Sequence, residues 1–138
     1  MSAKHSIDPW FTGFADGEGS FTIMSKNGIS SPRFSLTLRA DDTAILAELC
    51  RCFGGTICTR TRAGTTSNPQ SQWYVGSKKD LRRLIAYFDD FPLRSKKARD
   101  YAIWREAVVA YCANGRTDPT LPNLFERLRT GRAYEEAA

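Results

Sequence analysis

The stretch WFTGFADGEGSF, residues 10–21, begins as an apolar helical segment and ends in a run of glycines and acids. Four of its residues recur at the i, i+3, i+4, i+7 spacing of one helix face, namely Trp10, Gly13, Phe14 and Gly17. A glycine inside a helix costs about 1 kcal/mol relative to alanine. Acids such as Asp16 and Glu18 near a helix C-terminus meet the negative end of the helix dipole. Both features are locally unfavourable, which indicates that they serve a function.

The chain beyond this helix alternates between strand and helix patterns. Apolar–polar alternation predicts strands over residues 20–26, 33–39, 56–62 and 70–75. Apolar residues three or four apart predict helices over residues 43–53, 78–88 and 95–113, with a short final helix over 121–130 before a frayed tail. Residues 27–32, NGISSP, are expected to form a turn or loop. This order predicts an α+β fold, αββαββα with additional C-terminal helices, in which helices cover one face of an antiparallel sheet.

The composition of the 138 residues is that of an ordinary globular domain, with 41% hydrophobic and 25% charged residues. We therefore expect a single domain over residues 1–138, with a core over about 8–113 and a C-terminal helix and tail over 114–138. No stretch approaches the roughly 20 apolar residues of a membrane span, and residues 1–10 lack the apolar region of a signal peptide. An intracellular protein is expected, in the cytoplasm, the nucleoid or an organelle matrix, with no membrane partner.

The four cysteines are expected to be reduced thiols, because the sequence shows no export signal. Cys50 and Cys52 have C-x-C spacing and the only histidine is His5, so a structural zinc site is not expected.

One face of the predicted sheet is basic and polar. The net charge is +5, yet neither residues 19–39 nor residues 55–76 contain an acid. An antiparallel ribbon fits the major groove of DNA, where arginine and lysine read guanine and glutamine reads adenine. The predicted DNA-contacting side chains are Ser20, Thr22, Met24, Lys26, Arg33, Ser35, Thr37, Arg39, Thr56, Cys58, Arg60, Arg62, Gln70, Gln72 and Tyr74. The alternatives are a solvated face that binds nothing and an RNA-binding face, which usually displays several aromatics where this one has only Tyr74.

Residues 11–19, FTGFADGEG, resemble the nonapeptide motif of the LAGLIDADG homing endonucleases, with Glu18 in place of the motif's second aspartate. Further segments are similar to this family, namely RADDTAILAELCRCFGG (39–55), WYVGSKKDLRRLI (73–85) and FPLRSKKARDYAIW (91–104). The resemblance covers roughly residues 9–112 and implies a saddle-shaped sheet. With one motif in the sequence, it also implies the single-motif class, which works as a homodimer.

The family's dimer gives the opening glycines a role. Gly13 and Gly17 lie four residues apart on the face of Trp10 and Phe14. Small residues at that spacing allow two helix backbones to approach closely. The expected dimer interface is therefore Trp10, Gly13, Phe14 and Gly17.

The resemblance also implies the chemistry, which is hydrolysis of one phosphodiester in each strand of a long, near-palindromic DNA target. Two Glu18 carboxylates brought side by side in a dimer repel each other, and a divalent cation relieves this repulsion. The implied metal ligands are Glu18 and the Gly17 carbonyl, and the implied cofactor is Mg²⁺, with Mn²⁺ substituting and Ca²⁺ binding without cleavage. Lys97, with Lys96 second, is the implied catalytic lysine near the scissile phosphate, whereas Asp16 is expected to be structural.

Two other readings stay open. The first is a catalytically silent DNA-binding protein or an intron RNA-splicing maturase on the same fold, and the second is a dimerisation module that binds no nucleic acid. In the latter, Glu18 is a solvated acid at a helix end, and Lys96 and Lys97 are surface cations. The intact acid and the lysine pair favour a metal-dependent DNA endonuclease encoded in an intron or another mobile element.

Overall fold

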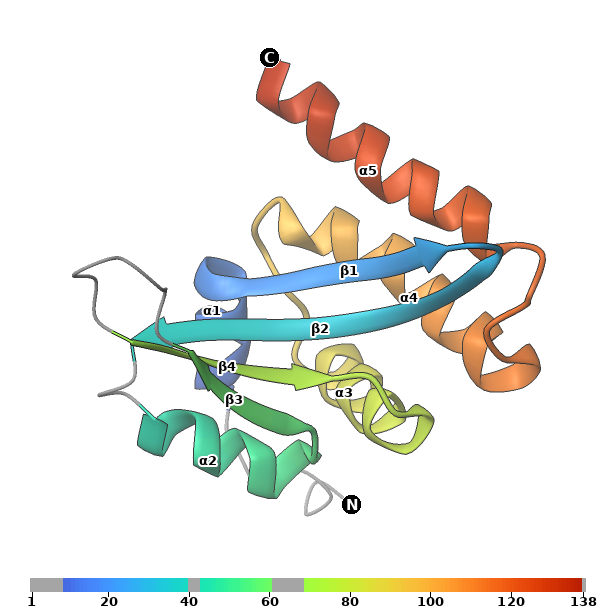
Figure 1. Ribbon diagram of the computed structural model, residues 1–138. Helices are drawn as coiled ribbons and strands as arrows, with labels where there is room; N and C mark the ends of the chain where they lie inside the picture. Colours follow the sequence, from blue (N-terminus) through green and yellow to red (C-terminus); the bar gives the residue numbers. More distant parts are fainter. Residues whose placement is uncertain (1–8, 40–42, 61–68, 138) are drawn as a thin grey trace.

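Two hairpins build one antiparallel sheet in this chain, and helices pack against it (Figure 1). The structure is a computed structural model that describes residues 9–39, 43–60 and 69–137. Its elements are α1 (Trp10–Glu18), β1 (Gly19–Lys26), β2 (Ile29–Arg39), α2 (Thr43–Phe53), β3 (Thr56–Arg60), β4 (Gln70–Val75), α3 (Lys78–Asp90), α4 (Lys97–Asn114) and α5 (Leu121–Ala137). The strand order is β1-β2-β4-β3, so the two hairpins meet at the β2–β4 pair.

The turn of the first hairpin is shorter than predicted. Asn27 and Gly28 have φ angles of 55° and 78° and form a two-residue turn, the arrangement that an Asn-Gly pair favours. The expected loop over 27–32 is therefore wrong beyond Gly28, because β2 already begins at Ile29. Pro32 pairs with Ile23 of β1, but β4 pairs with β2 only from Phe34 onward, so on the β4 side no strand needs an N–H from the proline.

The core lies between the sheet and the helices behind it in Figure 1. Phe11 of α1 is its centre, with no exposed surface. Its ring lies within about 5–6 Å of five other rings, those of Phe34, Phe53, Trp73, Tyr87 and Phe88. Ala15, one turn further along α1, is also fully buried. One face of α1 is thus anchored in the core of its own chain.

The C-terminal region differs from the prediction in its length. The expected short helix over 121–130 with a frayed tail is instead one helix, α5, that extends to Ala137, because the residues after Gly131 (RAYEEA) are mostly good helix formers. The connection before it is fixed by a hydrogen bond from the Ser30 N–H to the Arg116 carbonyl, 2.9 Å long. Among the described residues, no helix has the length and apolar character to cross a membrane.

Candidate active site and nucleic-acid interface

Glu18 lies at the junction where α1 passes directly into β1. It is the last residue of the helix, and its side chain is exposed. The next residue, Gly19, caps the helix with a hydrogen bond from its N–H to the Ala15 carbonyl. A Cβ atom at Gly19 would lie 2.8 Å from that carbonyl oxygen and 2.9 Å from the Phe34 ring. The junction therefore requires glycine, and this close packing holds Glu18 at the end of the helix.

Asp16 connects the end of α1 to the segment that leads into α4. Its Oδ1 accepts hydrogen bonds from the Ser95 hydroxyl at 2.7 Å and the Ser95 N–H at 3.0 Å. Its Oδ2 accepts the Arg94 N–H at 3.1 Å. Three donors on one carboxylate make Asp16 a structural residue, as the sequence predicts, and leave Glu18 as the exposed acid of the motif.

The same contacts shift the ionisation of Asp16. Burial by itself raises the pKa of this carboxyl. The hydrogen bonds from Ser95 and Arg94, together with the nearby charge of Lys97, outweigh burial and lower the pKa below its ordinary value. The charged form is therefore the one that the fold stabilises.

Asp16→Asn is expected to destabilise the fold by about 1–3 kcal/mol at pH 7, because charge-assisted hydrogen bonds are lost. The pKa of Asp16 is lower in the folded than in the unfolded state. The contribution of this carboxylate to the free energy of unfolding is therefore complete above the unfolded-state pKa of about 4, and it is lost as the pH falls below that value. Urea unfolding of the wild type and of Asp16→Asn at pH 7 and pH 3 measures the difference in stability. Glu48→Gln is the control, because Glu48 is exposed. An equal difference in stability at both pH values would contradict this role.

Lys96 and Lys97 stand at the beginning of α4. Lys96 is the exposed N-cap residue, and Lys97 is half-buried as the first helical residue. Because the charge of Lys97 acts on Asp16, the structure brings Lys97 to the end of α1 that also carries Glu18. The two parts of the predicted catalytic site, 79 residues apart in sequence, therefore lie at the same end of the molecule.

The junction of α1 and β1 carries two oxygen donors that a metal ion could use, Glu18 and the Gly17 carbonyl. Within the described ranges, no hydrogen bond or ion pair engages the Glu18 carboxylate, and no three His, Cys, Asp or Glu side chains are grouped to hold a metal ion. The Gly17 carbonyl lies in the last turn of α1, where carbonyls have no N–H partner within the helix. Both are oxygen donors, which Mg²⁺ prefers, but they do not form a complete site by themselves.

The strand register places the predicted DNA-contacting residues on one face of the sheet. Side chains of directly paired residues in antiparallel strands share a face. The rows across the sheet are Ser20–Ser35–Tyr74–Thr56, Thr37–Gln72–Cys58, Arg39–Gln70 and Thr22–Arg33, followed by Met24–Ser31 and Lys26–Ile29. Arg62 and the side chain of Arg60 lie outside what the structure describes. Ile29 and Ser31 also occupy this face and were missed because they were assigned to a loop, although the Asn-Gly turn signal before them indicates an immediate strand.

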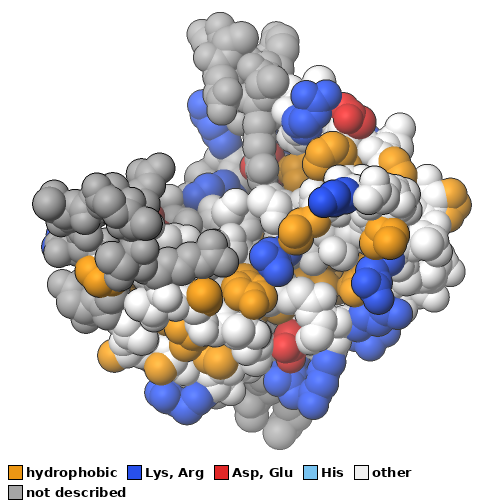
Figure 2. Space-filling view, in the orientation of Figure 1, with side chains coloured by type: hydrophobic (Ala, Val, Ile, Leu, Met, Phe, Trp, Pro, Cys, Tyr) orange, Lys and Arg blue, Asp and Glu red, His pale blue; other side chains and the backbone are white. Residues whose placement is uncertain are grey.

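This sheet face is open and basic. In Figure 2, Lys and Arg side chains are spread over it among uncharged ones. The Arg33 guanidinium lies 4.2 Å from the centre of the Tyr74 ring, and the Gln72 amide lies 3.4 Å from the Thr37 hydroxyl. The face thus offers hydrogen-bonding groups, whereas Tyr74, the one aromatic residue among the described strand positions on it, is already covered by Arg33.

The second face of α1 lies at the surface of the described chain. Trp10 is 41% exposed, and its ring lies 5.5 Å from that of Phe14. Gly13 and Gly17 are exposed, and a Cβ atom at either would have no neighbour within 4 Å. The four residues predicted for the dimer interface therefore form one apolar, glycine-containing strip on the surface of the described chain.

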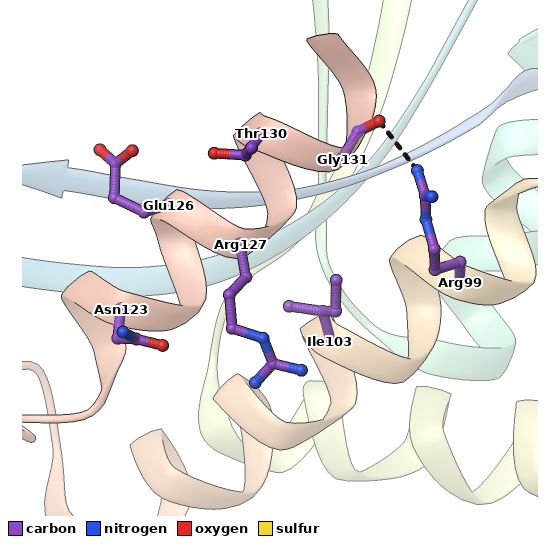
Figure 3. Close-up of a pocket in the computed structure, with 7 residues that line it drawn as sticks. All are labelled: Arg99, Ile103, Asn123, Glu126, Arg127, Thr130 and Gly131. Carbon is purple, nitrogen blue, oxygen red and sulfur yellow. Dashed lines mark hydrogen bonds between the residues drawn. The ribbon is translucent and has the colours of Figure 1, made fainter. Parts of the chain in front are cut away.

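A separate groove lies between α4 and α5 (Figure 3), with a volume of about 410 Å³. The Arg99 guanidinium donates a hydrogen bond of 2.9 Å to the Gly131 carbonyl across it, and Arg127 forms an ion pair with Glu106 at 3.4 Å. None of the predicted site residues lines this groove. Its polar contacts hold the two helices together, and it is distinct from the α1–β1 junction.

The exposed Glu18 carboxylate at the end of α1 thus lies next to an open basic sheet face. The chain belongs to the LAGLIDADG endonuclease family, whose profile matches residues 11–108. This confirms the predicted family and fold class.

Curated relatives carry intron-related names. The chain is 34% identical over 114 residues to an uncharacterized 50.9 kDa protein in ND4 intron 1 of Podospora anserina, covering 75% of this chain and 24% of the relative. It is 32% identical over 113 residues to the probable intron-encoded endonuclease Cox1-I1b of Schizosaccharomyces pombe, covering 78% of this chain and 28% of the relative. The chain thus spans about a quarter of the length of these relatives.

Solved structures give the same fold. The homing endonuclease I-GzeII in complex with its DNA target matches with a TM-score of 0.69 and 29% identity, over 90% of this chain and 44% of that one. The meganuclease I-AabMI bound to uncleaved DNA matches with a TM-score of 0.68 and 29% identity, over 78% and 38% of the two chains. The homing endonuclease I-TnaI shares the fold at 22% identity, with a TM-score of 0.73 over 96% of this chain and 99% of that one.

Proposed function

We propose that this chain forms a homodimeric, metal-dependent endonuclease that cuts both strands of a long, near-palindromic DNA site. The observation that carries the proposal is the exposed Glu18 carboxylate, free of partners among the described residues, at the edge of a sheet face without acids. A solvated acid at a helix end meets an unfavourable dipole. A bound cation would remove that penalty, and a basic face beside it would hold the polyanion on which the cation acts.

The proposed dimer completes the metal site. Pairing of the exposed α1 strips, Trp10, Gly13, Phe14 and Gly17, would bring two Glu18 carboxylates together. The Glu18 carboxylates and Gly17 carbonyls would then hold Mg²⁺, with Mn²⁺ substituting and Ca²⁺ binding without cleavage, and DNA phosphates would fill the remaining positions. When bound, such a metal activates water and stabilises the charge that develops on the phosphate.

The remaining roles belong to the protein's cations and polar face. Lys97, with Lys96 second, would offer its ammonium group to the scissile phosphate and stabilise the charge that develops during hydrolysis. The sheet would lie in the major groove, where Arg33, Gln70 and Gln72 present groups that read guanine and adenine edges. Because Tyr74 is covered by Arg33, the described part of the face has no free ring on which an RNA base would stack. This supports duplex DNA over RNA.

We further propose one domain over residues 1–138, with α5 packed on the core formed by about residues 8–113. The intron-related names of its relatives support an intron-encoded enzyme that acts in the compartment where its intron resides.

The test is selection from a randomised duplex-DNA library in three separate arms, with Mg²⁺, with Mn²⁺ and with Ca²⁺, followed by sequencing of bound and cut molecules. We expect cutting at one near-palindromic site with Mg²⁺, and binding without cutting at the same site with Ca²⁺. Selective binding without cutting in Mg²⁺ and Mn²⁺ would replace the endonuclease with a silent DNA-binding protein. Failure to select any duplex would redirect the search to intron RNA.

A further inference from the structure

Two exposed apolar side chains interrupt the polar sheet face. Met24 on β1 is 50% exposed and Ile29 on β2 is 47% exposed. Met24 pairs with Ser31 and Ile29 with Lys26, so the two apolar side chains are diagonal neighbours on one face, within about 8 Å. They form a small apolar pair at the outer end of the first hairpin, and we call it the Met24–Ile29 pair.

The fold does not need this pair. The core lies on the opposite face of the sheet, where Phe21 and Ile23 are buried. Serine or threonine, which occupy many other positions on the open face, would serve equally well there in contact with water. An apolar pair half exposed among polar and basic groups therefore points to a ligand with an apolar feature of its own.

We propose that the Met24–Ile29 pair contacts the 5-methyl groups of thymines in the outer part of each DNA half-site. The inference rests on the proposed function. In the major groove, the thymine methyl is the apolar group on the base edges, and apolar side chains are its usual contacts. Lys26 and Arg33 on the same face supply the charge that holds the strand pair against DNA, so the apolar contact adds selectivity to an already basic surface.

The strand geometry gives the position of these thymines. Met24 follows Glu18 by six residues along β1, and Lys26, the partner of Ile29, follows it by eight. At about 3.3 Å per residue, these residues lie roughly 20 Å and 26 Å along the strand from the junction. Since each base pair of B-DNA adds about 3.4 Å, the contacted thymines lie about six to eight base pairs from the position at which Glu18 acts.

The experiment compares thymine with deoxyuridine, which pairs identically but lacks the methyl group. A duplex selected in Ca²⁺ is resynthesised with deoxyuridine at one thymine position at a time, and the affinity of each duplex is measured. We expect thymine to be selected about six to eight base pairs from the cleaved phosphodiester of each half-site, and binding to weaken by about four-fold for each contacted methyl that is removed.

Variant proteins test whether the Met24–Ile29 pair causes the preference for thymine over deoxyuridine. The double variant Met24→Ser/Ile29→Ser is expected to bind the thymine and deoxyuridine duplexes equally. The matched control is Val109→Ser on α4, because Val109 is 49% exposed but lies on a helix behind the sheet. This control should keep the full preference for thymine, and thermal melting verifies that each variant is folded.

The outcomes separate this inference from the proposed function. Selective binding to duplex DNA with equal affinity for both bases at these positions overturns the role of the Met24–Ile29 pair and leaves the endonuclease intact. A thymine preference that survives the double variant also overturns it. Failure to bind any duplex selectively overturns the proposed function and this inference together.

Discussion

Glu18→Gln is expected to lower the rate of DNA cleavage by at least about 10³-fold while leaving duplex binding in the absence of divalent metal nearly unchanged. Glutamine has almost the same size and keeps an oxygen, but it lacks the charge that attracts a divalent cation. The substitution should not disturb the fold, because Glu18 is exposed and its carboxylate has no partner among the described residues. The measurement is single-turnover cleavage of the selected target in Mg²⁺, together with affinity for the same duplex.

The effect of Ca²⁺ on DNA affinity is a second readout. It distinguishes a variant that has lost the metal ion from one that is inactive for a different reason. If Glu18 holds the cation, Ca²⁺ should strengthen DNA binding by the wild type but not by Glu18→Gln. The control is Glu48→Gln, because Glu48 is an exposed acid on α2, and it should cleave normally. Full cleavage by Glu18→Gln would remove this carboxylate from the proposed mechanism.

Local patterns in the sequence predict most of the elements. The expected helix over 43–53 and strand over 70–75 coincide with α2 and β4. Glycines at 54 and 55 end the helix, and their φ angles of 81° and 90° are ones that other residues avoid. The error at residues 29–32 arose because serine and proline are typical of loops, whereas pairing with β1 determined the structure.

The candidate site was predictable where it depends on alternation, and not where it depends on distant contacts. Alternation alone predicts that Arg33 and Thr37 share a face. The contact of Asp16 with Ser95 spans 79 residues, and the pairing of β2 with β4 bridges α2 and β3. Neither leaves a local pattern in the sequence. Such contacts follow from packing of the core, which is why the position of Lys97 near α1 needed the structure.

Gly13→Leu is expected to have opposite effects on the dimer and on the single chain. A Cβ atom at Gly13 would meet no atom within 4 Å outside its chain neighbours and the adjacent backbone of α1, and replacing a glycine inside a helix removes a penalty of about 0.5–1 kcal/mol. The folded protomer should therefore tolerate leucine or become slightly more stable. In the proposed dimer, two leucines would separate helix backbones that glycine allows to approach closely, so the dimer should dissociate.

Light scattering and melting curves at several protein concentrations measure both effects. The melting temperature of a dimer rises with protein concentration, so this dependence should be present in the wild type and absent in Gly13→Leu. Ala113→Leu, at an exposed position of α4, is the control and should remain dimeric. Gly19→Ala should instead lower stability by about 1–3 kcal/mol, because its Cβ would lie 2.8 Å from the Ala15 carbonyl oxygen. A Gly13→Leu protein that stays dimeric would place the interface elsewhere, and the two Glu18 carboxylates would then lack the contact that brings them together.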